Sequence, residues 1–418
     1  MKKARSTLMI ISFFLVCAMG VNLSGCTTGA QPRNLMEDMT PNNVSALDDL
    51  SSQNADAADF AIRLFKASEE SGKNTLISPL SVLCALAMTA NGAEEETLEQ
   101  MEAVLGMTTE ELNQYLYSYI ENLPQGEKYK LSLANSIWFT EDERFRVNPD
   151  FLQTNADYYR ADIFKTPFND QTCRDINHWV EESTDGMIPE ILDQIPDEAI
   201  MYLVNALAFE AEWMEVYEEH RVRGGKFTRE DGTEQDAEFM HGTDHVYLED
   251  ENATGFMKYY QGGKYAFVAM LPKEGVSVTD YVASLDGESL HMLLSNPQYE
   301  TVITAIPKFE TEYEVEMSAI LQAMGMTDAF DVCLADFSGL GTYTDGNIYI
   351  SRVLHKTFIS VGEKGTKTGA ATMVEVACGS AAPSVEPKKV NLDRPFVYML
   401  VDCENNMPFS IGTMMDVG

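Results

Sequence analysis

Histidine spacing is the first chemical feature of the sequence, because two imidazoles four residues apart can hold one zinc ion. His241 and His245 have this spacing, which is that of the His-Glu-x-x-His motif of metalloproteases. The motif places glutamate directly after the first histidine, where this sequence has Gly242. Two surface histidines near a turn therefore explain the pair better than a metal site, and we predict no bound metal.

Other catalytic motifs are present only as fragments or are missing from the sequence. Lys367–Gly369 reads Lys-Thr-Gly, one element of the serine β-lactamase set, but the required Ser-x-x-Lys element does not occur. The sequence has no glycine-rich phosphate loop of either common type. It also lacks Cys-x-x-Cys, so neither a zinc knuckle nor a thioredoxin-type site is indicated. We therefore expect no enzyme activity and no cofactor.

The charge of the chain excludes one class of partner. The 418 residues include 66 acidic and 29 basic ones, which gives a formal net charge of −37. Proteins that bind nucleic acid need a basic face, so this class is excluded. A strongly negative surface stays soluble and attracts cationic partners. The apolar fraction of 45% supplies an ordinary globular core.

The N-terminus has the features of a bacterial lipoprotein signal. Basic residues at the start precede an apolar run over 8–19, which is too short to favour a membrane-spanning helix. The sequence Leu-Ser-Gly-Cys, which ends at Cys26, resembles a lipobox. We expect residues 1–25 to be removed and Cys26 to carry the lipid that anchors an extracellular protein to a membrane. An ordinary secretory signal, with a cysteine there by chance, would instead give a secreted protein.

Beyond the signal, the composition divides the chain into a tether and one large domain. Residues 26–56 are rich in Thr, Asn, Ser, Asp and Gln and poor in large apolar groups, so we expect a flexible tether. Residues 57–418 contain no internal repeat and no second linker, and they predict a single α+β domain. Apolar spacing predicts helices over 58–67, 80–90, 176–192 and 315–324, and strands over 131–139, 200–209, 265–271 and 302–306.

Residues 362–383 fit neither a buried strand nor a linker. They contain no aromatic residue and almost no large apolar one, whereas buried strands are rich in Val, Ile, Phe and Leu. Small groups nevertheless recur at every second position, at Thr366, Thr368, Ala370 and Thr372. This alternation would let the segment enter a tightly packed sheet.

Short motifs from Asn74 to the C-terminus resemble those of the serpins, in the same order and at similar spacing. The longest is HKTFISVGEKGTKTGAAT at 355–372, which is similar to the serpin strand and hinge. The others are NTLISPLSV at 74–82, INHWVEESTDGMI at 176–188, LVNALAFEAEW at 203–213, PKF at 307–309, MGMTDAF at 324–330, ADFSG at 335–339, DRPFVYML at 393–400 and FSIG at 409–412. The resemblance covers essentially all of residues 57–418.

The resemblance implies the serpin fold, with a large central mixed β-sheet, about nine helices, two smaller sheets and an exposed reactive-centre loop at about 363–390. It also implies suicide inhibition of a serine protease. The protease attacks the scissile bond of the loop and forms a covalent acyl-enzyme. The loop then inserts into the sheet as a new strand and distorts the protease before water can hydrolyse the acyl-enzyme. A serpin-fold protein that binds or interacts without inhibiting is the alternative.

Two groups of residues carry the insertion mechanism that the resemblance implies. The hinge is implied at Glu363, Gly365, Thr366, Gly369, Ala370, Ala371 and Thr372. A gate where the central strands part is implied at Ser78, Ser81, Asn205 and His355, with Trp213 under the entry point and Lys308 paired with Glu363. Lys367 and Thr368 stand where serpins usually have Glu and Ala, so we expect slower insertion and some substrate-like turnover.

The family spacing from Glu363 implies a scissile bond between Gly379 and Ser380. A displacement of one or two residues would move the bond to Ala377, Cys378 or Ala381. None of these residues is basic or aromatic, and protease S1 pockets of the elastase type are small. We therefore expect a monomeric inhibitor of elastase-like or subtilisin-like proteases, with cationic proteases favoured by the negative charge of the chain.

Overall fold

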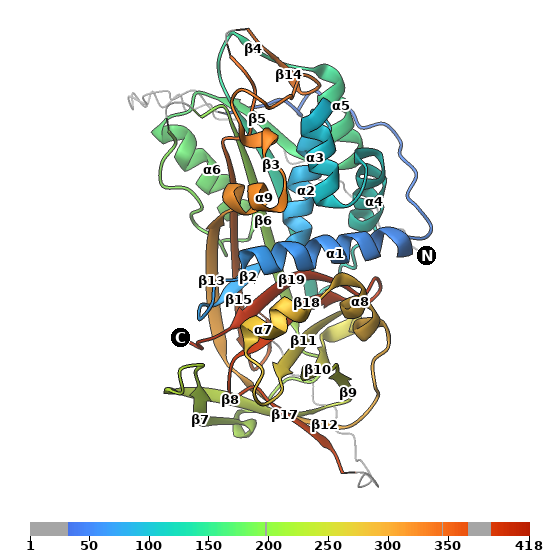
Figure 1. Cartoon of the computed structure of the whole chain (residues 1–418), viewed down its shortest axis with the longest axis vertical. Coiled ribbons are helices and arrows are strands. Elements are labelled where there is room, and N and C mark those ends of the chain that lie inside the picture. Colours follow the sequence, from blue (N-terminus) through green and yellow to red (C-terminus); the bar gives the residue numbers. More distant parts are fainter. Residues whose placement is uncertain (1–31, 197–198, 345, 367–385) are drawn as a thin grey trace, which may run out of the picture. The chain divides into compact units, whose positions relative to one another are not determined.

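Continuous apolar runs build the largest sheet, because its central strands are covered on both faces. The computed structural model describes residues 32–196, 199–344, 346–366 and 386–418 (Figure 1). The sheet is mixed, since β6 is antiparallel to β3 and parallel to β15. Its seven strands lie in the order β1 (Arg33–Asn34), β5 (Asp162–Thr166), β3 (Tyr129–Thr140), β6 (Met201–Glu212), β16 (Gly365–Thr366), β15 (Arg352–Gly362) and β13 (Phe309–Glu316).

Side chains of β6 alternate between two separate cores. Tyr202 and Val204 pack in a cluster with Ile176 of α6 (Asp170–Ser183), while Leu203 and Leu207 belong to the main core. Figure 1 shows α6 on one side of β3 and β6 and α2 (Pro79–Ala90) on the other. Because successive side chains of a strand point to opposite faces, a strand covered on both faces needs an apolar residue at nearly every position.

Two smaller sheets and a short ribbon complete the β-structure that the model describes. The six-stranded sheet has the order β2 (Thr75–Ile77), β19 (Met407–Met414), β18 (Phe396–Asp402), β11 (Tyr265–Pro272), β10 (Ala253–Tyr259) and β9 (Val246–Glu249). The four-stranded sheet has the order β17 (Lys388–Asn391), β12 (Val302–Pro307), β8 (Glu234–Asp244) and β7 (Val222–Thr228). A ribbon pairs β14 (Gly341–Tyr343) with β4 (Phe145–Val147).

The described residues form nine α-helices, and most begin at a side chain that caps the first turn. Ser78 accepts a hydrogen bond from the backbone N of Ser81 and is followed by Pro79, which is a favourable start for α2. None of these helices combines the length and the apolar character needed to cross a membrane. Besides α6, the helices are α1 (Ser51–Ser68), α2 (Pro79–Ala90), α3 (Glu95–Leu105), α4 (Thr109–Glu121), α5 (Pro149–Tyr158), α7 (Val278–Ser284), α8 (Gly287–Ser295) and α9 (Ser318–Met324).

The α+β fold and the eight predicted elements are confirmed, but the bounds of three of the four predicted helices are wrong. The helix expected from residue 58 begins at Ser51, and the helix expected from residue 176 begins at Asp170. The helix expected over 176–192 ends at Ser183, because Asp185 and Gly186 have φ of +51° and +76°, a conformation that ends helices. The helix expected to begin at residue 315 begins at Ser318 instead. Glu316 ends β13 and accepts a hydrogen bond from the backbone N of Ser318 at 3.0 Å, so strand and helix meet there.

The packed part of the chain begins earlier than the tether predicted over 26–56 allows. Arg33 and Asn34 pair with β5, and α1 begins at Ser51 rather than near residue 57. Between them, the backbone N of Leu47 donates to Ser118 Oγ at 2.8 Å, and Leu50 is buried. Polar composition suggested a solvated chain, but widely spaced leucines and backbone hydrogen bonds fix this segment. Residues 26–31 lie outside the described residues.

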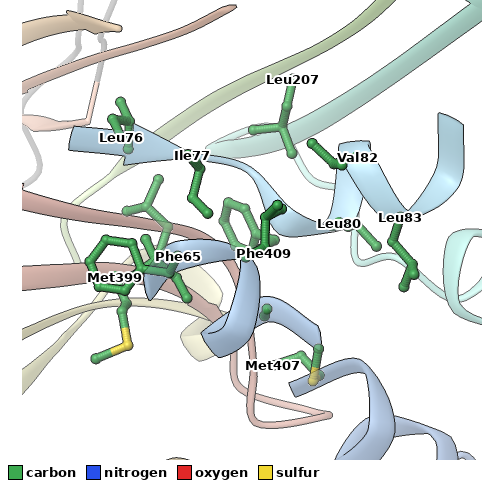
Figure 2. Packing of buried hydrophobic residues seen from close by; sticks show 14 of the residues in the cluster. Phe65, Leu76, Ile77, Leu80, Val82, Leu83, Leu207, Met399, Met407 and Phe409 are labelled. Atoms are coloured by element: carbon green, nitrogen blue, oxygen red, sulfur yellow. The ribbon is translucent and has the colours of Figure 1, made fainter. Parts of the chain in front are cut away.

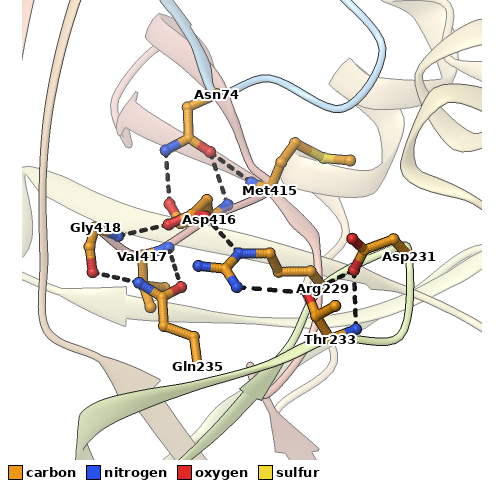
Figure 3. A network of polar contacts seen from close by, with 9 residues as sticks. All are labelled: Asn74, Arg229, Asp231, Thr233, Gln235, Met415, Asp416, Val417 and Gly418. Atoms are coloured by element: carbon orange, nitrogen blue, oxygen red, sulfur yellow. Dashed lines mark hydrogen bonds and ion pairs between the residues drawn. The ribbon is translucent and has the colours of Figure 1, made fainter.

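A polar network ties the C-terminal residues to the start of β2 (Figure 3). The side-chain oxygen of Asn74 accepts hydrogen bonds from the backbone N of Met415 at 2.6 Å and of Asp416 at 3.0 Å. The side-chain nitrogen of Asn74 donates to the carbonyl of Asp416 at 2.6 Å, and Arg229 Nε lies 2.5 Å from the Asp416 carboxylate. The first residue of the NTLISPLSV motif therefore anchors the end of the chain.

Phe409 is predicted to be a strong contributor to stability, because it lies where α1, α2 and β19 meet (Figure 2). Its ring lies 5.1 Å from that of Phe209 and 5.7 Å from that of Tyr265, and its exposed fraction is 1%. Phe409→Ala is expected to lower the free energy of unfolding by about 3–5 kcal/mol, measured by urea denaturation. Met292→Ala, at a 57% exposed position, is the control and should change it by less than about 0.5 kcal/mol. Equal losses in the two variants would contradict this assignment.

Candidate functional site

The candidate site is the place in the central sheet where the short strand β16 lies between β6 and β15. β16 forms an antiparallel hairpin with β15, with Thr366 opposite Val361, and also pairs with β6, with Thr366 opposite Ala211. Both β16 residues are buried. The first two hinge residues after the turn at Glu363 are therefore already part of the sheet.

Toward the start of β15, away from β16, the two flanking strands contact each other directly. β6 and β15 pair in parallel from Tyr202 opposite Arg352 to Ala206 opposite Lys356. Between this paired segment and β16, residues 207–210 of β6 have no partner on the β15 side among the described residues. The sheet is thus closed at one end and parted at the other, which is the geometry that a further strand needs to enter (Figure 1).

Gly365 is the residue that permits the entry. Its φ is +153°, and a Cβ built there would lie 1.9 Å from the carbonyl oxygen of Ala211. Only glycine can pass so close to the β6 backbone in this conformation. Any side chain at this position would force β16 away from β6.

The turn before β16 is held by a clamp, which we define as Trp213 and Tyr217 acting on residues 362–364. The backbone N of Trp213 donates to the carbonyl of Lys364 at 2.8 Å, and the backbone N of Tyr217 donates to that of Glu363 at 2.9 Å. The Trp213 indole Nε1 donates to the carbonyl of Gly362 at 2.8 Å. Every carbonyl of the turn therefore has a partner, so the turn is fixed.

Lys308 holds the same turn from the outside. Its Nζ lies 2.8 Å from the carboxylate of Glu363 and 3.1 Å from that of Glu238 on β8. The hydrogen bond to Lys308 lowers the pKa of Glu363, and the same bond raises the pKa of Lys308. The ammonium is about one-third exposed, so the pair contributes orientation more than stability. The structure thus brings together the two residues that the sequence analysis paired.

A buried cation lies beneath the clamp, and the sequence analysis missed it. Lys258 on β10 places its Nζ 5.5 Å from the ring centre of Trp213 and 4.6 Å from that of Tyr217. The same Nζ lies 3.3 Å from Asp244, whose other oxygen accepts a hydrogen bond from Thr304 at 2.8 Å. Cation–π attraction and a paired charge therefore fix both clamp rings. No local motif marks this lysine, because its partners are distant in the sequence: Asp244 comes from β8, and both rings come from the segment that follows β6.

The four predicted gate residues form one connected cluster at the paired end of β6 and β15. His355 Nδ1 lies 2.7 Å from Asn205 Oδ1, and Ser81 Oγ donates to the same oxygen at 3.0 Å. The backbone N of Ser78 donates to His355 Nε2 at 3.0 Å, and Ser78 Oγ donates to the carbonyl of Phe409 at 2.9 Å. The cluster links both central strands to α2, and a strand that advances between them must separate His355 from Asn205.

These contacts define the protonation of His355. Nε2 accepts a hydrogen bond from a backbone N–H, so the ring proton is on Nδ1 and is donated to Asn205. Burial lowers the pKa of His355 to about 3. The imidazole is therefore neutral, and a second proton on Nε2 would oppose the N–H of Ser78.

Asn135 lies beside the predicted gate residues, and the sequence analysis did not single it out. It lies on β3 directly opposite Asn205, and its Oδ1 is buried without a hydrogen-bond partner among the described atoms. An unpaired buried amide oxygen is costly, so this group is available to a donor when the cluster rearranges. The sequence signal that could have identified it is an amide side chain within the strand predicted over 131–139, where the other polar residues are Ser132 and Ser136.

The remaining predicted site residues lie outside the described residues. These are the distal hinge residues Gly369, Ala370, Ala371 and Thr372, the region of the scissile bond from Ala377 to Ala381 including Cys378, Gly379 and Ser380, and the lipidation residue Cys26. His241 and His245 are exposed on and after β8. In the described ranges, no group of three or more His, Cys, Asp or Glu side chains is arranged to hold a metal ion.

Comparisons with known proteins agree with this geometry. The model of one family, described as serpin (serine protease inhibitor), matches residues 55–417. A serpin-like protein of Thermococcus kodakarensis is 30% identical over 366 residues, which cover 85% of this chain and 84% of that protein. Human serpin B8 is 30% identical over 367 residues, covering 85% of this chain and 96% of that protein.

Solved structures of one thermophilic serpin, tengpin, allow a finer comparison. The crystal structure of its native state is 48% identical, covers 92% of this chain and all of that chain, and gives a TM-score of 0.88. The structure of its latent state, at 46% identity and with coverage of 91% and 100%, gives a TM-score of 0.78. The present arrangement of strands is therefore more similar to the native-state structure than to the latent-state one.

The stability of the protein is predicted to depend on pH through His355. Because its pKa is about 3 in the folded protein against an ordinary value of 6.5, the unfolded chain binds more protons between these values. The contribution of His355 to the free energy of unfolding is therefore greatest above pH 6.5 and decreases as the pH falls. Between pH 7.5 and pH 5 the decrease is about 2 kcal/mol. The measurement is the free energy of urea unfolding at both pH values.

His355→Gln is expected to remove this part of the pH dependence. His220→Gln is the control, since His220 is an exposed histidine, and it should leave the dependence unchanged. A wild-type stability that is flat over this range, or a slope that persists in His355→Gln, would contradict the assignment.

Proposed function

Since this chain belongs to the serpin family, whose members are generally protease inhibitors rather than catalysts, we propose that it is a suicide-type inhibitor of serine endopeptidases. The observation that carries the proposal is the seated hinge: Gly365 and Thr366 lie between β6 and β15, while the same strands pair directly with each other toward the start of β15. Because the first two residues of the inserting strand are already in the sheet, insertion requires only that an existing strand be lengthened.

The proposed mechanism uses the energy of strand addition. The serine of the protease attacks the carbonyl carbon of the scissile residue, proposed as Gly379, the amine of Ser380 leaves, and an ester joins the two proteins. The loop then extends β16 toward the segment where β6 and β15 pair directly. Each new residue pairs with strands on both sides, and about ten net hydrogen bonds of ~1 kcal/mol each give on the order of 10 kcal/mol. This energy is used to displace the protease and disturb its oxyanion hole before the ester is hydrolysed.

The gate sets how far insertion can proceed. The strand must separate His355 from Asn205 to pass the paired segment, so the hydrogen bonds of that cluster oppose insertion at first. Asn135, with its unpaired oxygen on the neighbouring strand, can supply a new acceptor once Asn205 has moved. The cluster therefore acts as a barrier in the native state and need not leave polar groups unpaired afterwards.

The proposed targets are elastase-like or subtilisin-like proteases. The residues around the proposed bond, from Ala377 to Ala381, are all small and uncharged, and they suit a small S1 pocket. The net charge of −37 favours encounter with cationic proteases. A serpin-fold protein that binds without inhibiting is the competing function, and the same experiment separates the two.

The test is to mix the protein with an elastase, a subtilisin and trypsin and to analyse the products on a denaturing gel. A covalent complex that survives hot SDS is expected with the first two enzymes. Thr366→Arg should abolish the complex while cleavage continues, because an unpaired charge is strongly disfavoured at a position with 1% exposure. Thr366→Ser is the control that should still form the complex. Cleavage of the wild-type protein without any complex, for all three enzymes, would favour the non-inhibitory function.

We further propose that the protein is a bacterial lipoprotein anchored outside the cell through Cys26, with secretion in soluble form as the alternative. The proposal is supported by the Leu-Ser-Gly-Cys sequence after a short apolar run. Cys26→Ser is expected to release the protein from the membrane fraction of an expressing bacterium. Unchanged membrane association of that variant would contradict lipid anchoring, and release of the wild-type protein would favour secretion.

A further inference from the structure

We infer that Tyr260 is a positioning residue for the hinge, and that its hydroxyl group holds Thr366 in the sheet so that insertion starts from a seated strand. The Tyr260 hydroxyl lies 2.5 Å from Thr366 Oγ1, and both residues are buried. Neither the hinge motif nor the gate cluster includes this tyrosine. The inference rests on the proposed function, because it assigns the residue a part in trapping a protease.

The ring of Tyr260 is fixed before its hydroxyl meets the hinge. It stacks on Trp213 at 4.4 Å between ring centres with an angle of 9° between the planes, and it meets Phe209 edge-on at 5.2 Å. The backbone carries it to this place, because Tyr260 forms an isolated bridge with Trp213, just after the end of β10. The position of the hydroxyl is therefore set by the core and not by the loop.

A buried tyrosine hydroxyl needs a hydrogen-bond partner. In the part of the chain that the structure describes, the partner found for this one is Thr366. Burial raises the pKa of Tyr260 far above its ordinary value, so the phenol stays neutral and can both donate and accept. The clamp of Trp213 and Tyr217 holds the turn at residues 362–364, whereas Tyr260 holds a residue that lies beyond the turn.

This hydrogen bond favours insertion, and it does not have to be broken as insertion proceeds. Thr366 already pairs with Val361 and Ala211, and these are the neighbours it keeps if β16 grows past it. The bond therefore exists at the start and at the end of insertion, and it opposes only withdrawal of the hinge. When a docked protease pulls on the loop, the hydroxyl keeps the first inward-facing residue in place, so growth of the strand competes better with hydrolysis of the ester.

The direct test measures the hinge without any protease. Hydrogen exchange of the backbone amides of residues 362–366 reports how often the hinge leaves the sheet. Tyr260→Phe keeps the ring and removes the hydroxyl, and Thr366→Val removes the other partner with little change of shape. Each is expected to speed exchange about fivefold, the effect of one net hydrogen bond, and the double variant should exchange no faster than either single one.

Tyr265→Phe is the matched control. Tyr265 belongs to the same aromatic cluster, but its hydroxyl donates to the carbonyl of Pro124 at 2.9 Å and does not contact the hinge. Hinge exchange in this variant should equal that of the wild type. No change in Tyr260→Phe, or the same increase in Tyr265→Phe, would overturn the assignment.

The second measurement is the ratio of cleaved inhibitor to covalent complex after reaction with an elastase. In Tyr260→Phe, the rate of loop cleavage should be unchanged, while the ratio of cleaved inhibitor to trapped complex should rise by up to about fivefold. Tyr265→Phe should behave as the wild type. Faster exchange with an unchanged ratio would overturn the role in trapping and leave an ordinary structural contact. If the wild-type protein traps no protease, the proposed function fails, and with it the trapping role. The exchange data would then still decide whether the hydroxyl seats the hinge.

Discussion

The structure depends on the incomplete pairing of two parallel strands. β6 and β15 pair directly over five residue pairs, and toward the end of β15 they are held apart by the two residues of β16. A sheet normally gains from pairing every backbone group, so this arrangement persists only because side chains fix both ends. At the closed end, His355 and Asn205 join the strands to each other, and Ser78 and Ser81 join them to α2. At the parted end, Trp213 and Tyr217 hold the turn that leads into β16.

The two ends differ in chemistry in a way that suits their tasks. The closed end uses neutral hydrogen bonds among small polar groups, which can be exchanged one for another when the strands move. The parted end uses aromatic rings over the buried Lys258 and its partner Asp244. Removing one member of such a charge pair is strongly unfavourable, so this region resists rearrangement. The hinge is therefore attached to the most rigid part of the site, and the strands are joined through its most adaptable part.

The sequence predicted the elements of the fold and the members of the gate better than the contacts between distant segments. Apolar runs located β3 and β6, and short motifs named Ser78, Asn205 and His355, because each signal is local or follows a family pattern. Lys258 and Tyr260 were missed, since their meaning comes from partners on other strands. The helix expected over 176–192 was too long because the conformation of two residues, not apolar spacing, ends it. Polar residues before position 57 suggested a solvated tether, but Arg33 and Asn34 pair with β5 and α1 already begins at Ser51.

That early segment has a practical consequence for anyone who shortens the gene for protein production. The family model begins at residue 55, and a start there would discard β1, Leu50 and the first turn of α1. The loss would expose the unpaired backbone edge of β5. An exposed strand edge can pair with another molecule and so promote aggregation. It would also remove Asn54, which links the hydroxyl of Tyr115 to the side chain of Asn405. A shortened protein is therefore better begun before β1 than at the family boundary.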